Sequence, residues 1–260
     1  MREAPAIETL LAARASAVVV IAAGASSRFA AIELARSLGL PFHDRAPPEP
    51  ALLLVQTDTR LELHDSSSGA RLYVEFTAAE LRRYRAGGPG GDPLRRALGP
   101  GDRHVVDATA GLGGDAVHLA ALGYRVTAIE RHPIVSALAQ DGLRRARAAG
   151  LLGENPLWRT GDARVVLPAL APSPAAIYLD PMFPAKRKKS AAVRKEMRLL
   201  RLLVADDNDA AALLAGARRV ATDRVVVKRP VDAPPLAPGS AASYRGKLVR
   251  YDVYRPERHD

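Results

Sequence analysis

Short apolar runs and one amphipathic stretch organise the first third of the chain. The run Ala17–Ala23 predicts a buried β-strand, and a 3.6-residue apolar period predicts a helix over about Ser27–Leu38. A proline-rich segment, PFHDRAPPEP, then ends that helix. The predicted core-facing stripe of the helix consists of Phe29, Ile32, Leu34, Ala35 and Leu38.

Three further short runs predict strands: LLLVQTD (52–58), RLELHD (60–65) and RLYVEF (71–76). The last two flank a Ser/Gly turn at Ser66–Gly69, which is typical of a hairpin. We therefore expect a small N-terminal α/β domain over residues 1–85. The stretch 81–99 is rich in glycine and arginine, which predicts a basic linker over about 86–100.

After Gly101 strands and helices alternate, as in a parallel sheet covered on both faces. The pattern predicts a helix opening at Pro133 and another over about Glu196–Ala217, broken near 206–209, while KLVRYDVY (247–254) predicts an edge or antiparallel strand. The predicted parallel strands lie in HVVDATAG (104–111), YRVTAIE (124–130), PLWRTGD (156–162), AAIYLDP (175–181) and RVVVKRP (224–230). The expected fold class is α/β, with a Rossmann-like sheet over residues 101–260 that binds ligands beyond its carboxyl strand ends.

Composition narrows the classes of function. The formal net charge of +10 favours a polyanionic partner, above all nucleic acid, although broad use of arginine gives the same balance. The chain has no cysteine, so disulfides, thiolate metal sites and cysteine nucleophiles are excluded. No apolar run approaches the roughly 20 residues of a membrane helix, so we expect a cytoplasmic protein without a membrane partner.

The segment Asp107–Asp115, DATAGLGGD, joins a predicted strand to a predicted helix. Gly111, Gly113 and Gly114 allow a tight turn and a close approach of the backbone to a ligand. The order is not the G-x-G-x-x-G of dinucleotide folds, and an acidic residue at the strand end, Asp107, suits a cationic or amino-bearing ligand better than a phosphate. S-adenosylmethionine carries both a sulfonium and an ammonium group, whereas the structural alternative is a simple tight turn.

Two further strand ends carry acidic residues. Glu130 ends the second strand about 20 residues after the glycine turn, where a carboxylate can accept hydrogen bonds from both ribose hydroxyls of a nucleoside. Arg131 could flank the adenosine, and Asp162 could accept from the adenine amino group. Taken singly, a strand-end glutamate or arginine is more often a solvated surface residue, and Gly-Asp is an ordinary turn pair. The interval between the glycine turn and Glu130 favours the ribose role for that carboxylate.

The segment Asp180–Pro184, DPMFP, follows the fourth strand. On a turn stiffened by Pro181, Phe183 can stack on an unpaired base while Asp180 accepts from its exocyclic amine. Such hydrogen bonds orient a weakly nucleophilic amine toward a methyl donor, so orientation and electrostatics can supply the catalysis without a strong base. A plain proline turn with Phe183 in the core is the alternative interpretation.

A basic run follows this turn directly, in the sequence KRKKSAAVRK. Charge runs are often solvated, but this position beside the predicted base pocket favours contact with RNA phosphates. The expected RNA-binding residues are Lys186, Arg187, Lys188, Lys189, Arg194 and Lys195. The six histidines show no metal-ligand spacing, so no metal is expected.

These motifs occur in one order that resembles a known family. DATAGLG, the ERHP segment from Glu130, YLDPMFP, KKS with a following RKEM, and VVVKRP resemble the small-subunit rRNA guanine-N2 methyltransferases known as RsmJ, over about Leu81–Tyr254. The resemblance implies methylation of guanine 1516 of 16S rRNA, in the usual ribosomal numbering, with S-adenosylmethionine as cofactor. It places cofactor contacts on Gly114, Asp115, Glu130, Arg131, Asp162, Ala163 and Asp180. We expect the protein to act as a monomer on 16S rRNA or the small subunit.

Three other functions remain open from the residues alone. A DNA or RNA amino-methyltransferase acting on adenine or cytosine would use the same geometry, although no segment for reading duplex DNA is evident. A non-catalytic RNA-binding assembly factor has no need for Glu130 and Asp180. A nicotinamide oxidoreductase would show G-x-G-x-x-G and a catalytic Tyr–Lys or His pair, and neither is found.

Overall fold

The computed structural model describes residues 18–49, 51–86, 91–181, 198–204 and 209–257. Its contacts divide the chain into two compact units. The first comprises residues 1–75, 140–145 and 184–206, and the second comprises 76–139, 146–183 and 207–260. The predicted boundary at residue 85 stays a prediction, and each unit is described by itself below.

The first unit contains a five-stranded mixed sheet in the order β2-β1-β3-β4-β5. The strands β1 to β3 pair in parallel, whereas β3, β4 and β5 form an antiparallel meander. The expected hairpin is present, with Gly69 at a φ of 65° in its turn. The elements are β1 (Val18–Ala22), α2 (Arg28–Leu38), β2 (Phe42–His43), β3 (Leu52–Gln56), β4 (Leu61–Asp65) and β5 (Ala70–Leu72).

The core-facing side of α2 differs from the predicted stripe. Phe29 is 77% exposed, so its assignment to the core was wrong, and the buried residues of the helix are Ala31 and Ala35. Small side chains allow a helix backbone to approach a sheet closely, and the amphipathic period alone does not distinguish a stripe of alanines from a stripe of larger residues.

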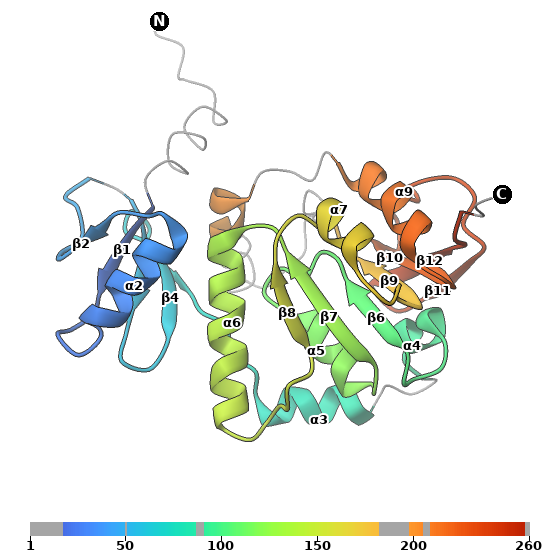
Figure 1. Ribbon diagram of the computed structural model, residues 1–260, viewed down its shortest axis with the longest axis horizontal. Coiled ribbons are helices and arrows are strands. Elements are labelled where there is room, and N and C mark those ends of the chain that lie inside the picture. The colour runs from blue at the N-terminus through green and yellow to red at the C-terminus, as the bar shows by residue number, and fades with distance from the viewer. Residues whose placement is uncertain (1–17, 50, 87–90, 182–197, 205–208, 258–260) are drawn as a thin grey trace, which may run out of the picture. The chain divides into compact units, whose positions relative to one another are not determined.

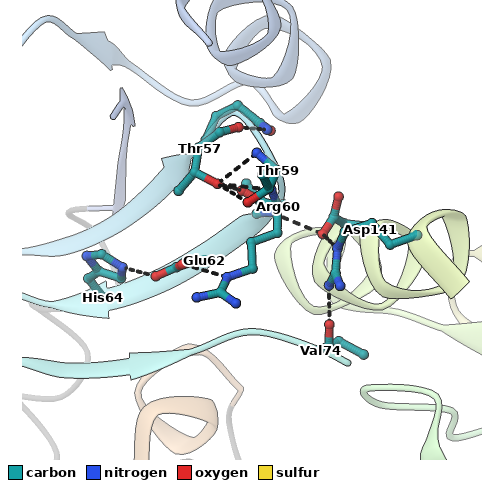
Figure 2. Close-up of polar contacts among 10 residues, drawn as sticks. Thr57, Thr59, Arg60, Glu62, His64, Val74 and Asp141 are labelled. Atoms are coloured by element: carbon teal, nitrogen blue, oxygen red, sulfur yellow. Dashed lines mark hydrogen bonds and ion pairs between the residues drawn. The ribbon is translucent and has the colours of Figure 1, made fainter. Parts of the chain in front are cut away.

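Residues 140–145, a turn of α6 (Pro133–Ala148), belong to the first unit and make polar contacts there. Asp141 accepts the backbone N–H of Leu61 at 3.1 Å, and Arg145 donates to the carbonyl of Val74 (Figure 2). Nearby on β4, Glu62 accepts from Arg60 and His64, each at 2.7 Å. Burial works to raise the pKa of Glu62, but the hydrogen bonds from His64 and Arg60 outweigh it and lower that pKa.

Two helical glycines lead to opposite predictions. A Cβ at Gly142 would lie 2.5 Å from Cγ1 of Val74, whereas the nearest atom of the described residues to a Cβ at Gly216 would be an arginine nitrogen at 3.8 Å. Alanine gains about 1 kcal/mol over glycine in a helix, but overpacking costs roughly 1–3 kcal/mol. We expect Gly142→Ala to lower the free energy of unfolding and Gly216→Ala to raise it, as measured by urea denaturation. Equal shifts in both variants would contradict the clash.

The second unit contains a seven-stranded sheet in the order β11-β12-β10-β9-β6-β7-β8 (Figure 1). The five strands from β10 to β8 pair in parallel, and β12 runs antiparallel to β10 and β11. This confirms the Rossmann-like fold class. The segment 249–254 forms an antiparallel strand, but the edge of the sheet is β11, and β12 lies between β11 and β10. The strands are β6 (His104–Asp107), β7 (Arg125–Glu130), β8 (Leu157–Thr160), β9 (Ala176–Leu179), β10 (Arg224–Pro230), β11 (Ala242–Arg245) and β12 (Val249–Tyr254).

Successive side chains along these strands point to opposite faces of the sheet and form a hydrophobic cluster on each face. Val105, Tyr178 and Val226 pack with helices α4 (Pro93–Leu98) and α5 (Gly114–Ala121) on one face. Val106, Ile177 and Val225 pack with α7 (Ala163–Val166) and α9 (Ala210–Val220) on the other. The helices of this unit include α3 (Ala78–Ala86), α4 (Pro93–Leu98), α5 (Gly114–Ala121), α7 (Ala163–Val166), a short 3₁₀ helix (Leu167–Ala169) and α9 (Ala210–Val220).

Part of the segment expected to be a linker is helical. Residues 93–98 form α4, in which Leu94, Ala97 and Leu98 are fully buried. Asp92 caps this helix by accepting the N–H of Leu94, and Pro93 occupies its first turn, which are ordinary helix-start signals. Among the described helices, none combines the length and the apolar character needed to cross a bilayer.

Candidate active site

Four charged residues lie at the carboxyl ends of parallel strands in the second unit. Asp107 ends β6, Glu130 ends β7, Asp180 directly follows β9, and Lys228 lies near the end of β10. From β6 the chain runs outward through β7 to β8 and then crosses back to β9 on the other side of β6, so β6 and β9 form the topological switch point of the sheet. Ligands of open α/β sheets bind at such a point.

The glycine turn lies between β6 and α5. Gly111 and Gly113 have φ values of 54° and 87°, a region that side chains other than glycine rarely adopt. A Cβ at Gly113 would lie 3.3 Å from Trp158 and 3.4 Å from Phe76, whereas a Cβ at Gly111 or Gly114 would meet no atom of the described residues within 4 Å. The turn is therefore fixed by its backbone and leaves open space beside two of its glycines.

Glu130 fastens this turn to β7. One carboxylate oxygen accepts the backbone N–H of Gly111 at 2.8 Å, and the other accepts the N–H of His132 at 2.7 Å. The backbone N–H of Ala110 also donates to the carbonyl of Ile129 at 3.0 Å. The predicted ribose contact of Glu130 stays a prediction, and the structure adds a second role for its carboxylate as the anchor of the glycine turn.

Asp107 is 1% exposed. Its Oδ1 accepts the N–H of Thr109 at 3.2 Å, while its Oδ2 has no hydrogen-bond partner within the described ranges. Burial raises the pKa of this carboxyl well above its ordinary value, and the neighbouring Asp115 adds to the rise. A buried carboxyl oxygen without a partner is costly unless a donor from a ligand completes it.

Lys228 joins two carboxylates from different elements. Its Nζ lies 2.7 Å from Oδ2 of Asp115, on α5, and 2.9 Å from Oδ2 of Asp180. The hydroxyl of Tyr178 donates to Oδ2 of Asp115 at 2.6 Å. The backbone N–H of Asp180 donates to the hydroxyl of Thr109 at 2.6 Å, which ties the end of β9 to the turn after β6.

These contacts set the protonation states. Partial removal from water raises the pKa of Asp180 to about 6, although the Lys228 ammonium opposes the rise and the Asp115 carboxylate adds to it. For Asp115, the attraction of Lys228 outweighs the effect of burial and lowers the pKa. Asp180 is thus mostly ionised at neutral pH. Its side chain is 37% exposed, so a substrate can reach it.

The other described residues predicted to bind the cofactor or the base have ion-pair partners within the protein or are buried. Arg131 lies 3.1 Å from Asp209, and Asp162 caps α7 and pairs with Arg164 at 2.5 Å, which lowers the pKa of the Asp162 carboxyl. Ala163 begins α7 and is buried, and Pro181 is also buried. Their predicted roles remain untested. Phe183 and the basic residues Lys186, Arg187, Lys188, Lys189, Arg194 and Lys195 lie outside the described residues.

Lys228, Tyr178 and Thr109 belong to this cluster but were not predicted from the sequence. Lys228 offered one signal, since it directly follows three consecutive valines in a predicted buried strand, and an ammonium group buried there needs a charged partner. Tyr178 looked like an ordinary strand residue. Thr109 was one of several small residues in the turn, and its contact depends on the pairing of β6 with β9.

Comparisons with known proteins identify the family of this chain. Residues 33–256 match a family model described as "Putative SAM-dependent methyltransferase". The chain is 44% identical to a ribosomal RNA small subunit methyltransferase J of Edwardsiella ictaluri, covering 93% of this chain and 99% of that protein. A protein of the same name from Serratia proteamaculans is 44% identical, covering 80% of this chain and 88% of the other. A crystal structure of a SAM-dependent methyltransferase from Neisseria gonorrhoeae has a TM-score of 0.71 and 33% identity, covering 94% and 97%.

The fold and the matched family model define the class, a methyltransferase that depends on S-adenosylmethionine. The chain belongs to the methyltransferase J family, which its 44% identity over most of its length shows. The resemblance stated from the sequence motifs is thereby confirmed.

The residues at the strand ends fit this cofactor. Among the described residues, Oδ2 of Asp107 has no partner and the space beside Gly111 and Gly114 is open, which suits a ligand that brings an ammonium donor close to the turn. Asp107, Asp115 and Asp180 provide carboxyl groups against one ammonium, that of Lys228, within this cluster. An excess of acidic groups favours a ligand that carries positive charge on sulfur and nitrogen.

Proposed function

We propose that this protein transfers a methyl group from S-adenosylmethionine to the N2 amine of a guanine in 16S rRNA, with guanine 1516 as the target that the family resemblance implies. The observation that carries the proposal is the Asp180 carboxylate, held at the switch point of the sheet by Lys228 at 2.9 Å and by the contact of its backbone with Thr109. The names of the relatives support the rRNA substrate.

The proposed mechanism assigns orientation to Asp180. Its carboxylate accepts an N–H of the guanine amine, which turns the nitrogen lone pair toward the methyl donor. When bound, S-adenosylmethionine would supply an electrophilic methyl group, with its sulfur as the leaving group. The methylated amine then carries one surplus proton, which Asp180 can accept and pass to water because its pKa is raised to about 6.

Cofactor binding is assigned to the other strand ends. Asp107 accepts from the cofactor ammonium, Glu130 and the glycine turn hold the ribose side, and Asp162 with Ala163 lies toward the adenine. Pro181 stiffens the turn that presents Phe183 to the base. The protein acts as a monomer in the cytoplasm, where the small ribosomal subunit is available as substrate.

The distribution of charge supports an RNA substrate. Residues 76–260 carry 31 Lys and Arg against 19 Asp and Glu, whereas residues 1–75 carry 7 against 9. The excess of positive charge therefore lies in the part of the chain that includes the candidate site and the basic run 186–195. Contacts between basic side chains and phosphates give RNA binding its dependence on salt.

The decisive experiment maps the methylated nucleotide. The purified protein is incubated with labelled S-adenosylmethionine and unmodified 16S rRNA or small subunits, and the product is digested and analysed by mass spectrometry. We expect N2-methylguanosine at a single position. A labelled adenosine or cytidine would show that the protein methylates the amine of another base. The absence of label in every RNA substrate would overturn the proposed rRNA methyltransferase function.

A charge reversal tests the basic run. We expect the double variant Lys188→Glu and Lys189→Glu to bind rRNA more weakly and with a shallower dependence on salt, because two phosphate contacts are lost. The matched control reverses Arg36 and Arg71, two exposed arginines of the first unit. Filter binding at several salt concentrations measures both variants, and equal affinities at low salt would show that the run does not contact RNA.

A further inference from the structure

Lys228 is the least expected member of the cluster. The strand RVVVKRP carries three buried valines directly before it, and the lysine side chain itself is only 22% exposed. Placing an ammonium group in such surroundings is costly unless paired charges compensate for it. The protein supplies two, Asp115 at 2.7 Å and Asp180 at 2.9 Å.

The strand register explains how the three groups meet. Side chains alternate along a strand, so Lys228 lies on the same sheet face as Val226. For the same reason Asp180, two positions after Tyr178, lies on the face of Tyr178. Val226 and Tyr178 both pack on the face that α5 covers, and α5 carries Asp115 in its first turn. Lys228 therefore lies between the end of β9 and the beginning of α5 because of the fold itself.

We propose that Lys228 is a positioning residue for methyl transfer, which holds the Asp180 carboxylate charged and fixed for the incoming amine and uses Asp115 as its second anchor. The inference rests on the proposed function, since it deepens the role of Asp180. Lys228 does not contact the reacting atoms in this mechanism. It acts through the carboxylate that does.

The charges around Asp180 explain why a cation is needed there. The titratable groups that interact electrostatically with it on the same face of the sheet are Asp115 on α5, Asp107 on β6, Tyr178 on β9, Tyr251 on β12 and Lys228 on β10. Arg229, on the opposite face of β10 by strand alternation, also interacts with it. Removing the lysine ammonium would leave the carboxylates of Asp180 and Asp115 as close neighbours of like charge, so Asp180 would take up a proton at a higher pH. A protonated carboxyl group accepts hydrogen bonds from an amine more weakly than a carboxylate does.

The pH dependence of methyl transfer tests the proposal. For the unaltered protein, kcat should fall as the pH drops through about 6, because Asp180 is then protonated. In Lys228→Met we expect the midpoint to move upward by about 1–3 pH units. Lys228→Arg keeps a cation and should restore most of the original profile, and the control Lys247→Met changes an exposed lysine on the turn before β12.

The cofactor affinity and the melting temperature are measured for each variant beside the pH profile. A rate reduced by the same factor at every pH in Lys228→Met, with the midpoint unmoved, would show a merely structural role and overturn the proposal. Failure of Lys228→Arg to restore the profile while it binds cofactor normally would also count against it.

A measurement on the protein alone covers the case in which Lys228→Met does not fold. With ¹³C-labelled aspartate and lysine, the carboxyl signal of Asp180, assigned from Asp180→Asn, and the ε-carbon signal of Lys228 should shift together with a midpoint near 6. A Lys228 signal that does not change through the titration of Asp180 would overturn the pairing. Because this measurement needs no substrate, it tests the pairing of Lys228 with Asp180 independently of whether rRNA is methylated.

Discussion

Asp180→Ala is expected to reduce methyl transfer to rRNA by roughly 10²–10³-fold or more, since it removes the acceptor that orients the target amine. Cofactor binding should be weakened but remain measurable, because Asp107, Glu130 and the glycine turn are unchanged. Lys228 keeps Asp115 as its partner in the variant, so the fold should persist. Single-turnover assays with labelled cofactor measure the rate, and calorimetry measures the affinity.

Two further variants sharpen this test. Asp180→Asn retains the shape and one acceptor oxygen but not the charge, so its rate should lie between those of the unaltered protein and Asp180→Ala. Asp58→Ala removes an exposed carboxylate of the first unit, outside the strand-end cluster, and should leave the rate unchanged. An undiminished rate in Asp180→Ala would remove the mechanism proposed.

Much of the second unit followed from local signals. The apolar runs near 105, 127, 177 and 226 became β6, β7, β9 and β10, because strands buried on both faces have few polar positions. The parallel order placed their carboxyl ends at one edge, so Asp107, Glu130 and Asp180 could be grouped from sequence alone. This part of the site depends on topology, which the alternation of elements indicates.

Other features depend on contacts that no local pattern encodes. The link between Lys228 and Asp115 joins residues 113 positions apart, and the hydroxyl of Thr109 meets the backbone of Asp180 across two strands. Phe29 was misplaced for a related reason, because the amphipathic period identified a helix but not which of its faces packs on the sheet. In both cases packing between distant segments decided the outcome.

The two carboxylate oxygens of Glu130 make contacts within the protein that the sequence did not predict. The position of Glu130 at the end of β7 predicted that its carboxylate binds the ribose of a ligand. The structure shows that the same carboxylate accepts the N–H groups of Gly111 and His132. The residue can therefore determine the shape of the glycine turn as well as the affinity for cofactor, and a substitution there should affect both.

Glu130→Gln is expected to weaken S-adenosylhomocysteine binding by roughly 10–100-fold, because hydrogen bonds to a charged acceptor contribute about 1.5–3 kcal/mol. The new amide can accept only through its oxygen, so its NH₂ group opposes one of the backbone N–H groups of Gly111 and His132. Calorimetry gives the affinity, and hydrogen exchange should show faster exchange at those two amides.

The matched control is Glu154→Gln, which changes an exposed glutamate before β8. Unchanged affinity together with unchanged exchange would exclude both the anchoring and the ribose-binding role of Glu130, whereas faster exchange with unchanged affinity would leave it the anchor alone.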